Sequence, residues 1–331
     1  MHPAKRIAGL LSIYCVLLNL FPSRAADSPR IQGTFLQLLN SHFDWQPDKW
    51  VQLFDYFRQL GISELVIQWT VSDQTAFFTS PTLSGGTPFE KSLELCDKHR
   101  IKVYAGLVRD PAYWAKIGQD SALAKSYLRK AIVQSEAASN QLIAIVQKHP
   151  SFAGWYITEE IDDVNWVEPQ KRQVLFEYLH DLSAHLHKLA PSGKVALSGF
   201  SNANLDPKSL EKFWEELLKQ SSVDVVMFQD GIGAGKLQID YLGLYLAAIK
   251  KATDAQSREL QIVVETFRQV GEKPFAAVPA SLDRIKRQMD VAGRYSSKIV
   301  AFSVPEYMTP LAGQDAEHLF RDYLSSFPVS R

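Results

Sequence analysis

Residues 152–162 read Phe152-Ala-Gly-Trp-Tyr-Ile-Thr-Glu-Glu-Ile-Asp162, and residues 260–267 read Leu260-Gln-Ile-Val-Val-Glu-Thr-Phe267. Each is an apolar run of the kind that forms a buried parallel strand, and each ends in carboxylates. In a parallel barrel, the carboxyl ends of the strands open onto the face that carries the chemistry. The sequence therefore predicts two buried strands that deliver acidic side chains to one shared face.

A strand-like run followed by an amphipathic helical run recurs eight times along the chain. Helical patterns include 48–60, with Gly61 as a C-terminal stop, and 121–149, stopped by Pro150. This alternation indicates a parallel sheet with right-handed crossovers, and eight units favour a closed barrel. The predicted fold class is therefore α/β, as a single (β/α)8 TIM barrel. The expected strands are 31–39, 64–71, 102–108, 152–158, 194–199, 223–229, 260–266 and 298–304.

The N-terminus has the pattern of a secretory signal. Lys5 and Arg6 precede an apolar stretch over 7–21, and a Ser-Arg-Ala motif that ends at Ala25 offers small residues for signal peptidase. The stretch is shorter than the roughly 20 apolar residues of a membrane anchor. We therefore predict a removed signal peptide over 1–25, and no membrane anchor after its removal.

Cysteine content bears on the compartment. Without the signal, Cys96 is the single cysteine, so no intramolecular disulfide is expected. Exported proteins without disulfides are more typical of bacteria than of animal secretions, which favours a bacterial periplasmic or secreted protein. Cys96 lies at helical spacing from Leu93 and is expected to be a buried structural thiol.

Composition limits the partners and the number of domains. The 36 basic and 36 acidic residues cancel, so charge gives no reason to expect nucleic acid or an anionic membrane as a partner. With 46% hydrophobic residues, the mature chain can build one large core. We predict one TIM-barrel catalytic domain over 26–331.

Polar and aromatic side chains gather at the expected strand ends. Sugars present hydroxyl groups at their edges and C–H groups on their faces, so a saccharide site combines hydrogen-bonding groups with aromatic rings. The sequence therefore predicts a saccharide-binding cleft at the barrel mouth. The expected substrate-binding residues are Gln37, His42, Trp69, Arg109, Tyr156, Asn202, Gln229, Asp230, Glu306 and Tyr307.

Two adjacent glutamates compete for the barrel mouth. Trp155 and Ile157 are bulky and apolar and suit the face under the helices, which places Tyr156 and Glu160 on the opposite, inner face. Glu160 is therefore expected at the mouth. Glu159 stays as its rival, since the strand can bend after residue 158.

Glycoside hydrolysis needs one carboxylic acid to protonate the leaving oxygen and a second carboxylate to attack the sugar or to activate water. We expect Glu160 to be the general acid/base and Glu265 to be the nucleophile of a retaining mechanism. Inversion through water would need a wider separation of the carboxyl groups, roughly 6.5–9.5 Å against about 5–5.5 Å.

Each acidic residue also has a structural interpretation. Glu265 could be the ion-pair partner of Arg268. Asp162 and Asp163 precede a helical run that starts near residue 169, so helix capping is expected for them rather than catalysis. Asp230 stands before a glycine and could be a turn residue.

A metal site is not expected. His42 could suggest one, but no second histidine stands at ligand spacing from it. His180, His185 and His187 lie on an expected mid-chain helix, away from the strand ends. We predict neither a metal nor a cofactor.

Three segments resemble a bacterial family of glycoside-hydrolase-like barrels that is catalogued mainly as a domain of unknown function. The likeness runs over nearly the whole mature chain and implies a barrel that acts on glycans. It matches a Glu-Ile-Asp unit of the family to Glu160, Ile161 and Asp162, whereas relatives often carry a non-acidic residue in place of Glu159. The segments are Gly33-Thr-Phe-Leu-Gln37, Gly154-Trp-Tyr-Ile-Thr-Glu-Glu-Ile-Asp-Asp163 and Phe228-Gln-Asp-Gly-Ile-Gly233.

The favoured function is thus a glycosidase acting on a polysaccharide or oligosaccharide, with two glutamates as its catalytic groups. Two alternatives stay open. The barrel could be a catalytically silent saccharide-binding protein that serves an exopolysaccharide export or assembly complex. It could also be a different polysaccharide-modifying enzyme, such as a lyase or a deacetylase.

Overall fold

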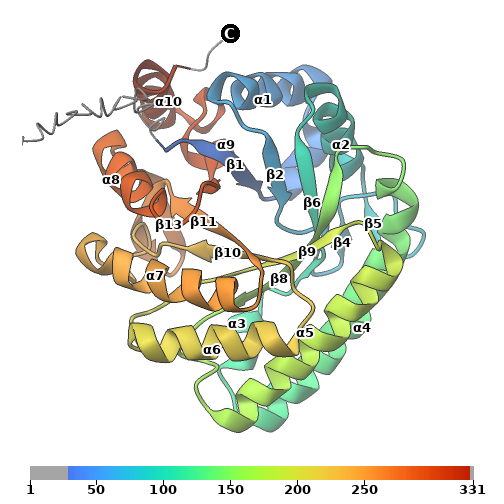
Figure 1. Cartoon of the computed structure of the whole chain (residues 1–331). Coiled ribbons are helices and arrows are strands. Elements are labelled where there is room, and N and C mark those ends of the chain that lie inside the picture. Colours follow the sequence, from blue (N-terminus) through green and yellow to red (C-terminus); the bar gives the residue numbers. More distant parts are fainter. Residues whose placement is uncertain (1–28, 329–331) are drawn as a thin grey trace, which may run out of the picture.

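The computed structural model describes residues 29–328, whose strands and helices form the barrel in Figure 1. Eight parallel strands pair in chain order, and the last pairs with the first. The predicted (β/α)8 TIM barrel is confirmed, and all eight predicted strands are present. The predicted signal peptide over 1–25 lies outside the described residues. The barrel strands are Ile31–Leu36 (β1), Glu64–Ile67 (β2), Lys102–Gly106 (β6), Phe152–Ile161 (β8), Lys194–Gly199 (β9), Val225–Gln229 (β10), Glu259–Glu265 (β11) and Ile299–Phe302 (β14).

Some strand ends differ from the prediction. β2 ends four residues earlier than the expected 71, because the backbone N–H groups of Thr70 and Val71 both donate to the carbonyl of Leu107 outside the barrel. In contrast, β8 runs to Ile161 and so carries both candidate glutamates. A small second sheet contains three short strands that follow β2 and one that follows β6. They are Val71–Ser72 (β3), Thr75–Ala76 (β4), Ser84–Gly85 (β5) and, after β6, Val108–Arg109 (β7).

Helices surround the barrel (Figure 1). The predicted helix over 48–60 is α1, which buries Trp50, Leu53 and Phe57 at helical spacing and stops at Gly61 with a left-handed φ of 77°. The helices are Pro47–Leu60 (α1), Pro88–His99 (α2), Tyr113–Ile117 (α3), Ser121–Val146 (α4), Pro169–Leu189 (α5), Pro207–Gln220 (α6), Ile239–Ala255 (α7), Leu282–Ala292 (α8), Val304–Tyr307 (α9) and Gln314–Ser326 (α10).

Side chains from alternate positions of the strands fill two cores. On β8, Trp155 and Ile157 are buried in the larger core outside the barrel, while Tyr156 lies in the inner core. Phe35 packs edge-on against Tyr156 there, at 5.5 Å between ring centroids. The predicted alternation of β8 is therefore confirmed, and the barrel interior is a packed core rather than a pore.

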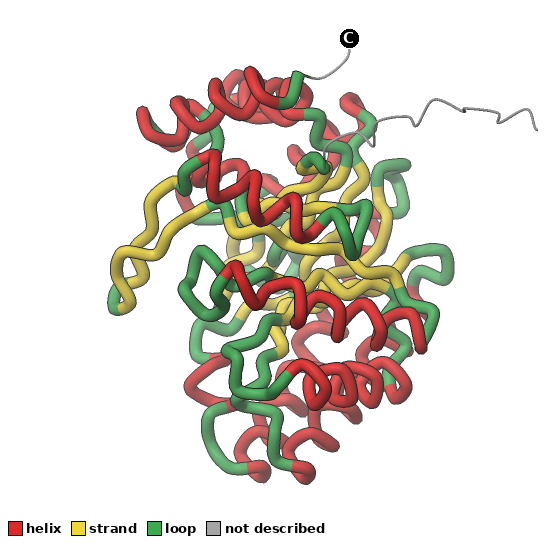
Figure 2. Tube along the Cα trace, turned by 60° about the vertical axis from the view of Figure 1, so that its left-hand side comes forward, coloured by secondary structure: helices red, strands yellow, loops and turns green. Residues whose placement is uncertain are grey.

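A two-stranded antiparallel hairpin follows β11. It is formed by Phe267–Glu272 (β12) and Phe275–Pro279 (β13), and Figure 2 shows such a ribbon projecting from the barrel. The side chains of Val270 and Phe275 are exposed on it. The hairpin begins two residues after Glu265 and so extends the wall beside that residue.

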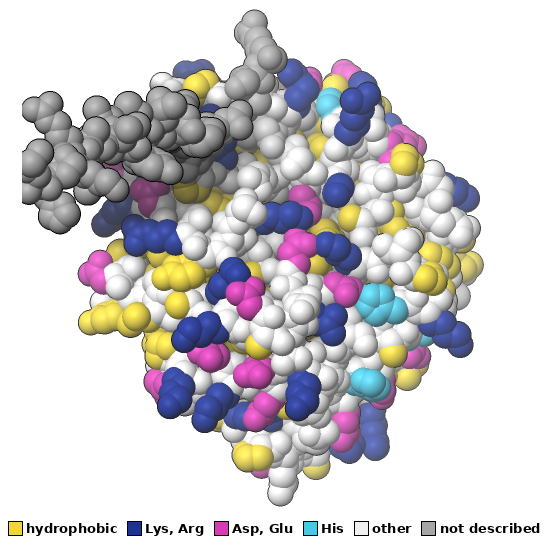
Figure 3. Space-filling view, in the orientation of Figure 1, with side chains coloured by type: hydrophobic (Ala, Val, Ile, Leu, Met, Phe, Trp, Pro, Cys, Tyr) yellow, Lys and Arg dark blue, Asp and Glu magenta, His cyan; other side chains and the backbone are white. Residues whose placement is uncertain are grey.

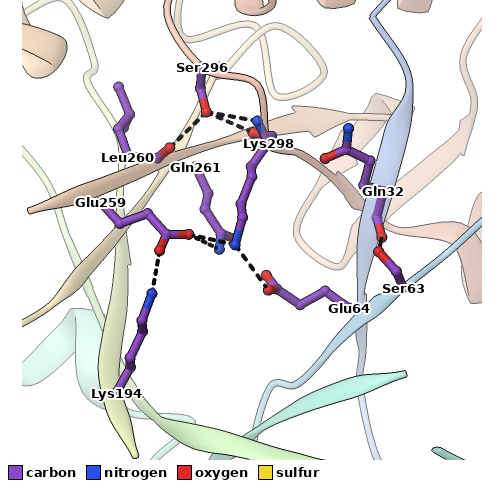
Figure 4. A network of polar contacts seen from close by, with 9 residues as sticks. All are labelled: Gln32, Ser63, Glu64, Lys194, Glu259, Leu260, Gln261, Ser296 and Lys298. Carbon is purple, nitrogen blue, oxygen red and sulfur yellow. Dashed lines mark hydrogen bonds and ion pairs between the residues drawn. The ribbon is translucent and has the colours of Figure 1, made fainter. Parts of the chain in front are cut away.

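An ion-pair network occupies the opposite, N-terminal end of the barrel (Figure 4). Glu259, the first residue of β11, accepts from Lys194 at 2.5 Å and from Lys298 at 2.8 Å. Lys298 also lies 3.7 Å from Glu64, the first residue of β2. Burial would raise the pKa of Glu259, but the hydrogen bonds from Lys194 and Lys298 outweigh it and lower the pKa to about 2. The network ties together the starts of β2, β9, β11 and β14.

The mutation Glu259→Gln should lower the free energy of unfolding by about 1–2 kcal/mol at pH 7, because the lysines lose their charged partner. The folded state holds the pKa of Glu259 at about 2 against an ordinary 4.5, so its contribution is complete above pH 4.5 and is lost as the pH falls toward 2. Urea unfolding at several pH values measures the difference. Glu64→Gln is the control, since burial raises the pKa of Glu64 and its charge is unfavourable. An equal loss of unfolding free energy in both variants would contradict the assignment of Glu259 as the stabilising carboxylate of this network.

Basic and acidic side chains are interspersed over the molecular face shown in Figure 3. This mixing agrees with the equal numbers of the two kinds in the sequence. Within residues 29–328, no helix combines the length and apolar character needed to cross a membrane. Cys96 is fully buried, as predicted.

Candidate active site

A cavity of about 1690 Å³ opens at the C-terminal ends of the barrel strands, and we call it the mouth cavity. It exceeds the roughly 300–1,000 Å³ of most small-molecule pockets, so it has room for more than one sugar unit. Every barrel strand, or the loop after it, contributes to its wall. The contributors in strand order include Gln37, Trp69, Arg109, Glu160, Asn202, Gln229, Glu265 and Tyr307.

Glu160 projects into the mouth cavity from the end of β8. Its Oε1 accepts a hydrogen bond of 2.8 Å from Nε2 of Gln229, and its carbonyl accepts one of 2.7 Å from the hydroxyl of Tyr113. Burial raises the pKa of Glu160, although the bond from Gln229 opposes this. A raised pKa favours the protonated form, from which a carboxyl group can donate a proton to a bound substrate.

Glu159 lies on the other side of β8 and does not line the mouth cavity. Its Oε2 accepts a hydrogen bond of 2.7 Å from the hydroxyl of Tyr178 on α5, and the residue is only 4% exposed. Burial raises its pKa to about 7. Glu159 lines a smaller cavity of about 110 Å³, which we call the side pocket and which shares Trp69, Arg109 and Glu160 with the mouth cavity.

Glu265 ends β11 and lines the mouth cavity, where it is 3% exposed. Its Oε2 accepts a hydrogen bond of 2.7 Å from the backbone N–H of Ala234. The alternative role as an ion-pair partner of Arg268 is wrong, because within residues 29–328 no carboxylate lies within 4.0 Å of that guanidinium. Burial and the neighbouring Asp230 carboxylate raise the pKa of Glu265, while the backbone donors and Lys236 act against that rise.

Asp230 is fully buried behind Glu265 and does not line the mouth cavity, so its predicted contact with substrate is wrong. Its Oδ1 accepts from the backbone N–H of Ile232 at 3.1 Å and of Glu265 at 3.3 Å, and its Oδ2 accepts from Gln288 at 2.5 Å. The turn interpretation is therefore the better one. Asp230 also fixes the backbone of Glu265 and places a second negative charge near it.

The mutation Asp230→Asn should shift the pH dependence of activity. Removing the Asp230 charge favours the ionised form of Glu265 and so lowers the pKa of Glu265. In the proposed mechanism the acidic limb of kcat/KM reports ionisation of Glu265, so this limb should move to lower pH. Asparagine keeps the volume, and Gln288 can turn its amide to accept the new N–H. A pH–rate profile checks the direction. An acidic limb that stays in place or moves to higher pH would contradict this coupling.

Of the remaining predicted binding residues, six line the mouth cavity and three lie elsewhere. Gln37 and Gln229 carry amides at the cavity wall, and Gln37 Nε2 donates to Gln68 at 2.7 Å. Trp69 donates its indole N–H to the carbonyl of Leu38 at 2.7 Å, which fixes the ring. Arg109, Asn202 and Tyr307 also line the mouth cavity.

The structure moves three predicted residues away from the mouth cavity. His42 is buried against Trp45 and Trp50, because the 3-10 turn Asn40–Asp44 folds its ring back onto the backbone of Leu39. Burial lowers the pKa of His42 to about 4. Tyr156 lies in the inner core with its hydroxyl 2.6 Å from Ser198, below the site. Glu306 turns back to accept from the hydroxyl of Ser303.

Capping by Asp162 and Asp163 is also wrong. Helix α5 starts at Pro169 with Glu168 in the N-cap position. Asp163 instead accepts from the hydroxyl of Ser201 at 2.6 Å and from the backbone N–H of Asn202 at 2.7 Å, so it holds the loop after β9. Asp162 lines the mouth cavity and bonds to Asn165.

Lys236 lines the mouth cavity but was not among the residues predicted from the sequence. It lies in the loop after β10, donates to Asn202 at 3.2 Å, and places its ammonium group 3.5 Å from the ring centroid of Phe200. The sequence signal for it is the glycine-rich segment directly after a strand, which ends in this lysine. The aromatic rings of Trp114 and Phe200, 5.7 Å apart, were missed as well.

Among residues 29–328, no three histidine, cysteine or carboxylate side chains lie close enough to hold one metal ion. Glu160 and Glu265 instead come to the mouth cavity from two different strands, β8 and β11, which suits acid/base chemistry.

The fold is that of the (β/α)8 barrels found in glycoside hydrolases. The structure superposes on a proposed alpha-L-fucosidase from Bacteroides thetaiotaomicron with a TM-score of 0.76, at 20% identity over 92% of this chain and 97% of that one. It also matches an endo-beta-1,4-mannanase from Thermotoga petrophila with a TM-score of 0.60, at 15% identity over 91% and 77% of the two chains. At these identities the likeness shows the fold.

The chain belongs to the family described as domain of unknown function DUF4434, which matches residues 31–314. A relative in Escherichia coli strain K12, the uncharacterized protein YbcH, is 30% identical over 248 residues, which cover 71% of this chain and 79% of that protein. The resemblance predicted from the sequence is thereby confirmed.

Proposed function

We propose that the protein is a glycoside hydrolase that acts on a polysaccharide or oligosaccharide. The observation that supports this most strongly is that Glu160 and Glu265, from the fourth and seventh barrel strands, both line the mouth cavity. In the proposed mechanism, Glu160 protonates the leaving oxygen and Glu265 attacks the sugar, which gives retention of configuration.

The surroundings of each glutamate support its proposed role. Among the described residues, the Glu160 carboxylate accepts a hydrogen bond from Gln229 alone, so an oxygen stays available for proton transfer. The backbone N–H of Ala234 fixes the attacking group and opposes the rise in the pKa of Glu265 that burial and Asp230 cause. Substrate binding that brings a partly positive sugar carbon next to Glu265 would favour ionisation further.

The cavity wall supports a saccharide as the ligand. Trp114 and Phe200 offer rings on one side, and Phe267 packs 5.3 Å from Tyr307 on another. Amides of Gln37, Asn202 and Gln229 line the same wall and can bond to hydroxyl groups. A wall that combines rings and amides matches the faces and edges of sugar units.

The proposed setting is the bacterial periplasm or the outside of the cell. It rests on the N-terminal sequence, whose charged start and apolar stretch suit a cleaved signal peptide. An exopolysaccharide export or assembly complex is a compatible partner for a hydrolase in that compartment.

Product analysis on a panel of bacterial and plant polysaccharides tests the proposal. A hydrolase should release fragments that carry new reducing ends and the mass of one added water. Fragments with unsaturated ends would indicate a lyase, and free acetate would indicate a deacetylase. Binding of a polymer without any release of products would favour the saccharide-binding alternative and contradict the proposal.

A further inference from the structure

The cationic side chains of the mouth cavity share an unusual property. Within residues 29–328, none of them lies within 4.0 Å of a carboxylate oxygen, although ion pairs are common elsewhere on the molecule. A partly buried charge is normally paired, because loss of water is unfavourable for it. The cations of the cavity wall are Arg109, Lys236, Arg268 and Arg284.

Two of the four have other partners, and a third is exposed to solvent. Lys236 donates to Asn202. Burial lowers the pKa of Lys236, and the charges of Glu160 and Glu265 oppose this more than any other charges do. Arg284 donates to the backbone carbonyls of Glu265 and Phe267, so it supports the end of β11. Arg268 is exposed on the hairpin and stays solvated.

Arg109 is different because it is partly buried and held in place without being neutralised. Its guanidinium lies 4.7 Å from the ring centroid of Trp69, and Nη1 donates to the hydroxyl of Ser72 at 3.0 Å. Burial lowers its pKa, which indicates that lost hydration is not fully replaced. A guanidinium has five N–H donors, so most of them remain for a ligand.

The nearby carboxyl groups do not prevent an anion from binding. Asp110 follows Arg109 but pairs with Lys116 at 2.7 Å. Glu159 and Glu160 share the side pocket with Arg109, and burial raises the pKa of both, that of Glu159 to about 7, which favours their uncharged forms.

We propose that Arg109 binds the carboxylate of a uronic acid unit, so that the substrate is an acidic saccharide. A planar guanidinium fork matches a carboxylate through two parallel hydrogen bonds, and contact with the Trp69 ring holds the fork in the cavity wall. This inference rests on the proposed glycoside hydrolase function and names its substrate class.

Matched polymers test the inference. Polygalacturonate, alginate and hyaluronan are compared with their carboxyl-reduced forms, which keep each linkage and lose the charge. Wild type should cleave at least one acidic polymer about 10–100-fold better in kcat/KM than its reduced form, as expected for a desolvated charge-assisted pair. The preference should fall with added NaCl. Arg109→Gln should reduce the preference for the acidic polymer to about threefold or less. Arg109→Lys should keep part of the preference, because it loses the fork geometry but keeps the charge.

The matched control is Arg268→Gln, which removes an exposed arginine from the same cavity wall. It should leave the preference within about threefold of wild type, because an exposed charge is screened. Loss of preference in Arg268→Gln but not in Arg109→Gln would overturn the assignment to Arg109. Equal or better cleavage of the reduced polymers, or cleavage of neutral or sulfated polymers alone, would overturn the substrate class while the hydrolase function stands. Absence of cleavage across all polymers would count against the hydrolase function itself.

Discussion

Replacing Glu160 by glutamine should lower the rate of polysaccharide hydrolysis about a thousandfold or more. Glutamine keeps the shape of the side chain and can still accept the hydrogen bond from Gln229, but it cannot donate a proton to the leaving oxygen. The loss should be much smaller for aryl glycosides of the same sugar with a good leaving group, which departs without protonation. Comparing kcat/KM for the polymer and for a dinitrophenyl glycoside measures this difference.

Glu159→Gln is the matched control, since it changes the neighbouring carboxyl group on the same strand. Its side chain bonds to Tyr178 and faces away from the mouth cavity, so the rate should stay within about threefold of wild type. A loss in Glu159→Gln as large as that in Glu160→Gln would contradict the assignment of the acid.

Replacing Glu265 by glutamine should also remove about a thousandfold or more of the rate, but for polymer and aryl glycoside alike. Attack on the sugar carbon is required whichever group leaves, so a good leaving group cannot compensate for a lost nucleophile. Proton NMR of the first product formed by wild type should show the configuration of the substrate, as a covalent intermediate requires.

The control for this variant is Glu272→Gln, which removes an exposed carboxylate of the same cavity wall on the β12–β13 hairpin. Its rate should change little. An inverted first product would contradict the nucleophilic role of Glu265, and so would a Glu265→Gln variant that retains its rate on aryl glycosides.

Much of the fold could be predicted because its signals are local. Eight apolar runs separated by helical patterns define the barrel, and the two-residue period of β8 separates Trp155 from Tyr156 correctly. The same period placed Glu160 on the side of the mouth cavity, and β8 continues to Ile161, although its pairing with β9 is irregular between Ile157 and Ile161.

The loops could not be predicted because contacts between distant residues shape them. Asp163 bonds to Ser201, 38 residues away, rather than to the helix that follows it. The backbone of Ala234 meets Glu265 across 31 residues, and this contact belongs to the same loop that brings Lys236 into the cavity. His42 shows the reverse case, in which a short local turn buried a side chain that its position after a strand had suggested for binding.

The most direct measurement is the rate of reducing-end release from a cleaved polysaccharide by wild type, Glu160→Gln, Glu265→Gln and Glu272→Gln, each shown to be folded by its thermal unfolding. We predict that wild type and Glu272→Gln cut at similar rates, whereas the other two variants each lose about a thousandfold or more. Equal rates in all four proteins would mean that Glu160 and Glu265 are not the catalytic pair of this barrel.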